Sequence, residues 1–148
     1  MKKWVLDIIC GLLIVLFVYA ASSKFFDYAQ FRTKLVNSPM LASYAGMISW
    51  LILLCELVIV LMLMVKNIRL YGLYGALFLL FLFTIYIAGM LLSGKNLPCS
   101  CGGVIRELSW AQHLAFNLFF MALSIVGIIL LTKKKKLATI IKENNKIL

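Results

Sequence analysis

Four long apolar runs constrain the fold of this chain more than any other feature of its sequence. They cover residues 4–21, 44–65, 70–92 and 112–131, and charged residues separate them. A helix of about 20 residues is long enough to cross the roughly 30 Å hydrocarbon layer of a bilayer. Inside that layer a single helix satisfies its own backbone hydrogen bonds, so we expect each run to be a transmembrane helix.

The composition agrees with a membrane protein. Of the 148 residues, 64% are hydrophobic and 14% are charged, whereas soluble domains have about 45–50% apolar residues. One soluble core of this size could not bury so much apolar surface, which excludes a water-soluble domain. We therefore predict an all-α membrane protein, an antiparallel bundle of four transmembrane helices in residues 1–132, followed by a basic cytoplasmic tail in residues 133–148.

The basic residues indicate the orientation of the bundle. The chain has 15 Lys and Arg against 5 Asp and Glu, a net charge of +10. In a soluble protein this balance would suggest a nucleic-acid partner, but here the basic residues stand between and after the apolar runs, so none is expected. With the N-terminus inside, ten of them are cytoplasmic and five are external. The positive-inside rule thus predicts both termini in the cytoplasm, most naturally at a bacterial inner membrane.

The start of the chain also allows a second interpretation. Lys2 and Lys3 before the first run could form the positive n-region of a cleavable signal peptide, with Val18-Tyr19-Ala20 as its cleavage site. Asp7 is unusual in such a region. Either way the following segment is delivered to the outer side.

Residues 22–43 are too polar to span the membrane. Phe25, Tyr28, Phe31 and Leu35 recur near helical spacing, and charged residues, among them Lys24, alternate with them. This pattern predicts an amphipathic helix at the outer interface, ending near Pro39. An ordinary connecting loop with some buried aromatic side chains is the alternative.

The second outer loop carries a Cys-x-Cys pair, Cys99 and Cys101, between Lys95 and Arg106. Thiols on this side of the membrane meet an oxidising environment. A disulfide between them would close a small, strained ring with a raised reduction potential, which makes it the better oxidant. The flanking basic residues favour the thiolate form. A passive disulfide or two free thiols remains the simpler alternative.

A metal site on the same loop is less well supported. Zinc binds about four ligands, and after Cys99 and Cys101 the next candidate is His113, so Glu107 or a water would have to complete the set. Cys10 lies near the inner end of the first span and Cys55 about eleven residues into the second, so each is about 15 Å or more from the outer surface and is not expected to contribute a ligand. We therefore predict no metal.

Three polar residues fall inside predicted spans. His113 and Asn117 are four residues apart and share one face of the last helix, where His113 could tune the cysteine pair or simply anchor the helix end. Glu56 lies near the middle of the second span, where an acidic group is either a proton acceptor or a buried hydrogen-bonding partner. Glu56 and Asn117 are the candidates for binding a cofactor. The possible partners of Glu56 include Tyr19, Tyr86 and Lys24.

A resemblance to a known family rests on Glu56 and on two segments. These are Pro98-Cys99-Ser100-Cys101-Gly102-Gly103 and Ser109-Trp110-Ala111-Gln112-His113-Leu114-Ala115-Phe116-Asn117. The chain resembles the MauE branch of the DoxX-like membrane proteins over residues 1–132, although it departs from the family's C-x-C-F-G pattern at Gly102. The resemblance implies four helices and a role in the redox maturation of exported proteins. MauE itself is linked to methylamine dehydrogenase, whose small subunit is rich in disulfides.

The leading hypothesis is a membrane thiol-disulfide oxidoreductase. Cys99 and Cys101 would exchange a disulfide with an exported client, and His113 would tune the thiolate. Electrons would pass to or from a membrane quinone or a thioredoxin-like protein. The alternatives are a non-enzymatic scaffold or assembly subunit whose cysteines only staple a loop, and a small-solute or metal transporter built around Glu56.

Overall fold

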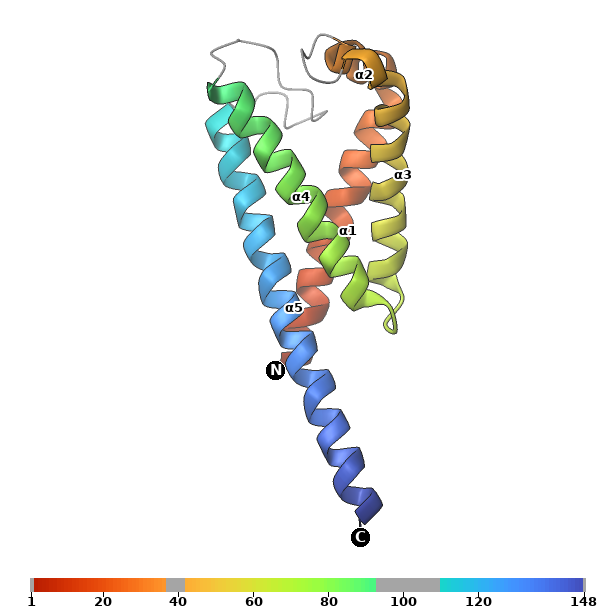
Figure 1. Cartoon of the computed structure of the whole chain (residues 1–148), viewed down its shortest axis with the longest axis vertical. Helices are drawn as coiled ribbons and strands as arrows, with labels where there is room; N and C mark the ends of the chain where they lie inside the picture. Colours follow the sequence, from red (N-terminus) through yellow and green to blue (C-terminus); the bar gives the residue numbers. More distant parts are fainter. Residues whose placement is uncertain (1, 37–41, 93–109, 148) are drawn as a thin grey trace.

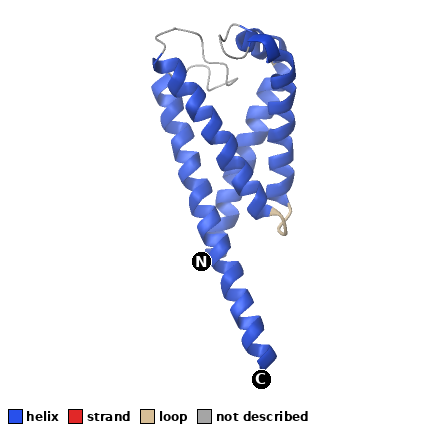
Figure 2. Ribbon diagram, viewed as in Figure 1, coloured by secondary structure: helices blue, strands red, loops and turns tan. Residues whose placement is uncertain are grey.

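A computed structural model describes residues 2–36, 42–92 and 110–147 of the chain. These residues form helices and short turns, without a β-strand in the described ranges, as Figure 2 shows. The helices are α1 (Lys2–Phe26), α2 (Tyr28–Val36), the short 3-10 helix η1 (Ala42–Tyr44), α3 (Ala45–Met64), α4 (Arg69–Leu92) and α5 (Trp110–Ile147). The predicted all-α fold is confirmed.

Four of these helices, α1, α3, α4 and α5, are long and apolar enough to cross a membrane. They run alternately up and down the molecule, as the antiparallel bundle requires (Figure 1). Helix α4 packs along α5, α1 packs along α3, and α3 and α1 contact α4 and α5 respectively. The predicted four-helix bundle is therefore confirmed.

The bundle buries a narrow core and exposes a broad apolar surface. Leu13, Phe17, Leu63 and Leu73 are less than 2% exposed and lie in one core cluster. Large apolar side chains around the outside, among them Leu61 at 63% and Phe78 at 63%, are exposed. In water such a surface would be unstable, whereas in a bilayer it contacts lipid.

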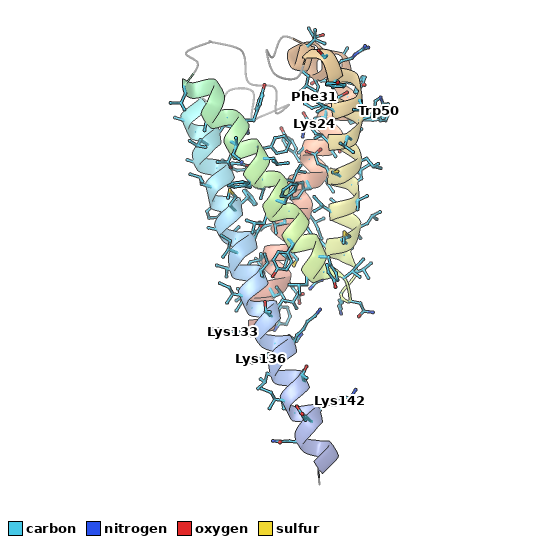
Figure 3. The ribbon with its side chains drawn as sticks, in the orientation of Figure 1. Lys24, Phe31, Trp50, Lys133, Lys136 and Lys142 are labelled. Carbon is cyan, nitrogen blue, oxygen red and sulfur yellow. The ribbon has the colours of Figure 1, made fainter. Side chains whose placement is uncertain are left out.

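Two helices are longer than the apolar runs that predicted them. The first run ends at residue 21, but α1 continues to Phe26. The last run ends at residue 131, but α5 continues through the lysine run to Ile147. Lys, Leu, Ala and Glu are good helix formers, so helical hydrogen bonding continues where the apolar character ends. The lower part of α5, with Lys133, Lys136 and Lys142, projects beyond the other helices (Figure 3).

The predicted amphipathic helix of the first loop is present as α2. Phe31 and Leu35 are buried with Ala45 of α3, while Arg32 is exposed. The assignment of Lys24 and Phe25 to this pattern was wrong, because both belong to α1. Lys24 is 5% exposed and Phe25 is 62% exposed. Since α1 does not break at residue 22, Lys24 continues its buried face, three residues after Ala21.

The bundle end at which α2 lies, here called the α2 end, also holds the last residue of α4, Leu92, and the first of α5, Trp110 (Figure 1). At the opposite end, Arg69 is the first residue of α4 and donates hydrogen bonds to two other helices. Its Nε donates to the Leu63 carbonyl of α3 at 3.0 Å, and its Nη1 donates to Asp7 Oδ1 of α1 at 2.7 Å. Asp7 is half-exposed, so this pair is a surface ion pair.

Candidate functional site

Four polar side chains from three helices line one cavity of about 50 Å³. Lys24 comes from α1, Glu56 from α3, and His113 and Asn117 from α5. The remaining lining residues are apolar: Leu16, Phe17, Ala20, Leu80, Phe83 and Phe116. We call this space the polar cavity. The sequence predicted three of its four polar residues as candidates, and the structure brings those three together.

Helical periodicity explains why these polar groups face inward. On α5, His113 and Asn117 begin a buried stripe that continues with Phe120 and Ser124, at spacings of four and three residues. On α3, Glu56 follows the buried Leu53 by three residues. Such spacings keep side chains on one face of a helix. Each polar residue thus occupies a position that an apolar core residue would otherwise fill.

Lys24 and Glu56 form a buried ion pair, in which Lys24 Nζ donates a hydrogen bond to Glu56 Oε1. The side chain of Lys24 is 5% exposed and that of Glu56 is 0% exposed. Of the three partners considered from the sequence, the structure joins Lys24 to Glu56. Burial removes the hydration of both charges, at several kcal/mol for each ion, so each group depends on the other.

The ammonium of Lys24 also faces two aromatic rings. Its Nζ lies 5.2 Å from the ring centroid of Phe83 and 5.8 Å from that of Phe31, and Figure 3 shows Lys24 and Phe31 together at the α2 end. A cation over a ring face is attracted by its quadrupole, more strongly when water is excluded. Phe31 thereby links α2 to the polar cavity, a contact that sequence spacing could not show.

Glu56 has a second carboxylate oxygen, Oε2, that does not take part in the hydrogen bond with Lys24. Its Oε2 is buried and accepts no hydrogen bond from the part of the chain that the structure describes. A buried carboxylate oxygen without a donor is costly, so such an atom in a native fold calls for an explanation, such as a water or a ligand. Because Glu56 lines the polar cavity, the cavity is where that partner would sit.

Asn117 is tied to α4. Its Nδ2 donates to the Leu80 carbonyl and to Thr84 Oγ1, both at 2.8 Å. Thr84 in turn donates to the Leu80 carbonyl at 2.8 Å. With both amide N–H groups engaged, Asn117 joins α5 to α4, and only its carbonyl oxygen could serve a ligand. The sequence pointed to Asn117 but not to Thr84, which is an unremarkable residue within an apolar run.

His113 lies three residues after the first residue of α5, about 5 Å along the helix axis. It is 6% exposed and lines the polar cavity. The predicted catalytic residues Cys99 and Cys101 lie outside the described residues. The cysteines within the described ranges, Cys10 and Cys55, are free thiols, buried and half-buried respectively. In those same ranges no three His, Cys, Asp or Glu side chains are grouped so as to hold a metal ion.

Comparison with known proteins identifies the family. A family model described as methylamine utilisation protein MauE matches residues 2–130. No match was found among curated proteins or among solved structures. The matched range covers the four polar residues of the cavity and α1, α3 and α4 in full, and it ends shortly before the lysine run of α5. The chain is therefore an integral membrane protein that belongs to the MauE family.

Proposed function

We propose that this protein is a membrane thiol-disulfide oxidoreductase that supports the maturation of exported proteins, with Cys99 and Cys101 as its exchanging pair. One observation supports it most. The segment that carries both cysteines joins Leu92 to Trp110, and these two helix ends lie at the α2 end of the bundle. His113 is one turn further along α5, so the segment with the cysteines is joined directly to a helix that lines the polar cavity.

The exchange proceeds through two thiolate attacks. A thiolate of the client attacks one sulfur of the Cys99–Cys101 disulfide, forms a mixed disulfide and releases the other cysteine as a thiolate. The second client thiolate then attacks the client sulfur of the mixed disulfide and releases the second cysteine. Two electrons have then moved from the client, which gains a disulfide, to the cysteine pair. The two protons lost when the client thiols ionised are matched by the two that the released cysteine thiolates take up. A membrane quinone would supply the oxidising power that restores the disulfide, taking up both electrons and both protons in doing so.

His113 serves this cycle as the group that tunes the cysteine thiolates. An imidazole takes up and releases protons near neutral pH, and its cationic form stabilises a nearby thiolate. The cysteines face outward in this proposal, and both termini are cytoplasmic, at a bacterial inner membrane. Because the family description names methylamine utilisation, an exported protein of methylamine metabolism is the first client to examine. A thioredoxin-like protein is the other candidate partner.

Trapping of the mixed disulfide tests this function. Exchange is reversible, so in a Cys101→Ser or Cys99→Ser variant the remaining thiolate attacks a disulfide of an oxidised client and releases one client thiolate. The mixed disulfide then lacks the second cysteine that would resolve it. We expect an exported protein in that adduct, released by reductant and absent from the Cys99→Ser/Cys101→Ser double variant. Cys55→Ser is the matched control and keeps normal exchange.

The double variant also distinguishes oxidoreductase from scaffold. If client disulfides form normally without Cys99 and Cys101, the redox function is wrong and the cysteines only staple their loop. Loss of client disulfides in the double variant, together with a trapped adduct in one single variant, supports the oxidoreductase.

A further inference from the structure

The polar cavity contains charged groups whose hydrogen-bonding capacity exceeds what the ion pair uses. Lys24 gives one hydrogen bond to Glu56 Oε1, whereas an ammonium can donate more than one. Glu56 Oε2 is buried and accepts none from the described residues. The two residues with this unused hydrogen-bonding capacity line the same space inside the bundle.

The size and lining of the cavity suit water. A cavity of about 10–15 Å³ by the same measure is enough for one buried water, which makes about three hydrogen bonds, and this cavity measures about 50 Å³. Polar groups reach it from three helices, and the rings of Phe17, Phe83 and Phe116 make up much of the remaining wall. Water can thus find several polar partners there.

We propose that the polar cavity is a hydrated proton-exchange site, in which water joins the carboxyl of Glu56 and the ammonium of Lys24 to the imidazole of His113. Among the described residues that line it, these three carry the charged or titratable groups. Leu80 and Phe83 of α4 and Asn117 of α5 are neutral.

The exchange step is balanced without any oxidant. The imidazolium of His113 loses a proton to a cavity water, and that water passes one of its own protons to Glu56 Oε2. An N–H bond breaks and a carboxyl O–H bond forms, while Lys24 remains an ammonium. The positive charge of the imidazolium and the negative charge of the carboxylate disappear together. Lys24 lies two residues before the end of α1 and His113 three residues after the start of α5, so both come from the part of their helix next to the α2 end.

Such a site would serve the cysteine pair. Oxidation of a dithiol by a quinone moves two protons along with two electrons, and the buried carboxyl of Glu56, near the middle of α3, can hold a proton between these steps. This use of the site rests on the proposed thiol-disulfide function. The existence of the site rests only on the contacts of Lys24, Glu56 and His113.

Infrared spectroscopy of the full chain in lipid nanodiscs tests the site. We expect a protonated carboxyl band to appear as the pH is lowered, to shift on transfer to D₂O, and to be missing in Glu56→Gln. Asp7→Asn is the control because Asp7 belongs to the other ion pair, at the far end of the bundle. Glu56→Asp keeps a carboxyl, so a displaced band in that variant assigns the signal even if Glu56→Gln folds poorly.

The kinetics of exchange test the role of His113. We expect the D₂O shift to be about 100-fold slower in His113→Gln than in the unaltered protein, as for loss of a general acid-base group. A Glu56 band that never appears while the protein stays folded, that resists D₂O, or that exchanges equally fast in His113→Gln overturns the proposal.

The same spectra separate the two proposals. If the Glu56 band exchanges as expected and no client is trapped on Cys99 or Cys101, the site stands and the oxidoreductase fails. If a client is trapped but the Glu56 band does not exchange in D₂O, the oxidoreductase stands and the proton-exchange site fails.

Discussion

At the residue scale, the buried pair of Lys24 and Glu56 shows what sequence reasoning can and cannot reach. Glu56 is conspicuous because an acidic residue within an apolar run is costly. Lys24 is not, because it follows the apolar run and resembles any loop lysine. Its inward direction depends on α1 continuing past residue 21, and its pairing depends on how α1 packs against α3. Neither the inward direction of Lys24 nor its pairing with Glu56 can be read from the spacing of residues in the sequence.

The pair is mutually dependent, so the two charges should be tested one at a time and together. We expect Lys24→Met to lower the free energy of unfolding by about 3–5 kcal/mol, because it leaves a carboxylate buried without its cation. Lys24→Met/Glu56→Leu should recover most of that loss, since the double variant buries no charge. Denaturant unfolding in detergent micelles or bicelles measures both. Equal losses in the single and double variants would contradict mutual compensation.

The second ion pair supplies the control for this measurement. Asp7 is half-exposed in its pair with Arg69, and exposed pairs contribute about 0–1 kcal/mol. Asp7→Asn should therefore change stability much less than Lys24→Met. The contrast would show that burial, rather than the presence of an ion pair, sets the dependence.

At the element scale, the four spans were predictable because their apolar character is continuous over the thickness of a bilayer. Their ends were less so, since apolar character and helical hydrogen bonding stop at different residues, as in α1 and α5. The approach of α3 to α4 was also beyond prediction. Added to Gly72, a Cβ would lie 3.0 Å from the Leu63 nitrogen and 3.1 Å from the Met62 carbonyl carbon. The close turn between these helices requires a glycine there, which composition alone could not show.

Two glycines of α4 therefore make a matched pair. We expect Gly72→Ala to destabilise the protein by about 1–3 kcal/mol, because the new methyl group meets backbone atoms that cannot rotate away. At Gly89 a Cβ meets nothing within 4 Å, so Gly89→Ala should be neutral or stabilising by about 0.5–1 kcal/mol. Thermal unfolding in the same detergent compares them. A Gly72→Ala variant as stable as Gly89→Ala would show that α3 and α4 can move apart freely.

At the scale of the whole molecule, the distribution of basic residues and the arrangement of the helices together predict how the bundle is oriented in the membrane. The α2 end and the end from which α5 projects lie on opposite sides of the bundle, as Figure 1 shows. The lysine run, Lys133 to Lys136, lies on the projecting part of α5. The positive-inside rule predicts such a run in the cytoplasm. With the lysine run inside, we expect the α2 end of the bundle to face the outer side.

Labelling with a membrane-impermeant thiol reagent tests this orientation. In a Cys10→Ser/Cys55→Ser background, reduced spheroplasts should be labelled at Cys99 and Cys101 without permeabilisation. Ala138 is exposed on the projecting part of α5, so in a variant that lacks all four native cysteines, Ala138→Cys should be labelled only after permeabilisation. The reverse pattern would place the cysteine pair in the reducing cytoplasm, where a disulfide would not persist. Because the α2 end and the projecting part of α5 lie on opposite sides of the bundle (Figure 1), concordant results from both probes would fix the side on which a client must bind.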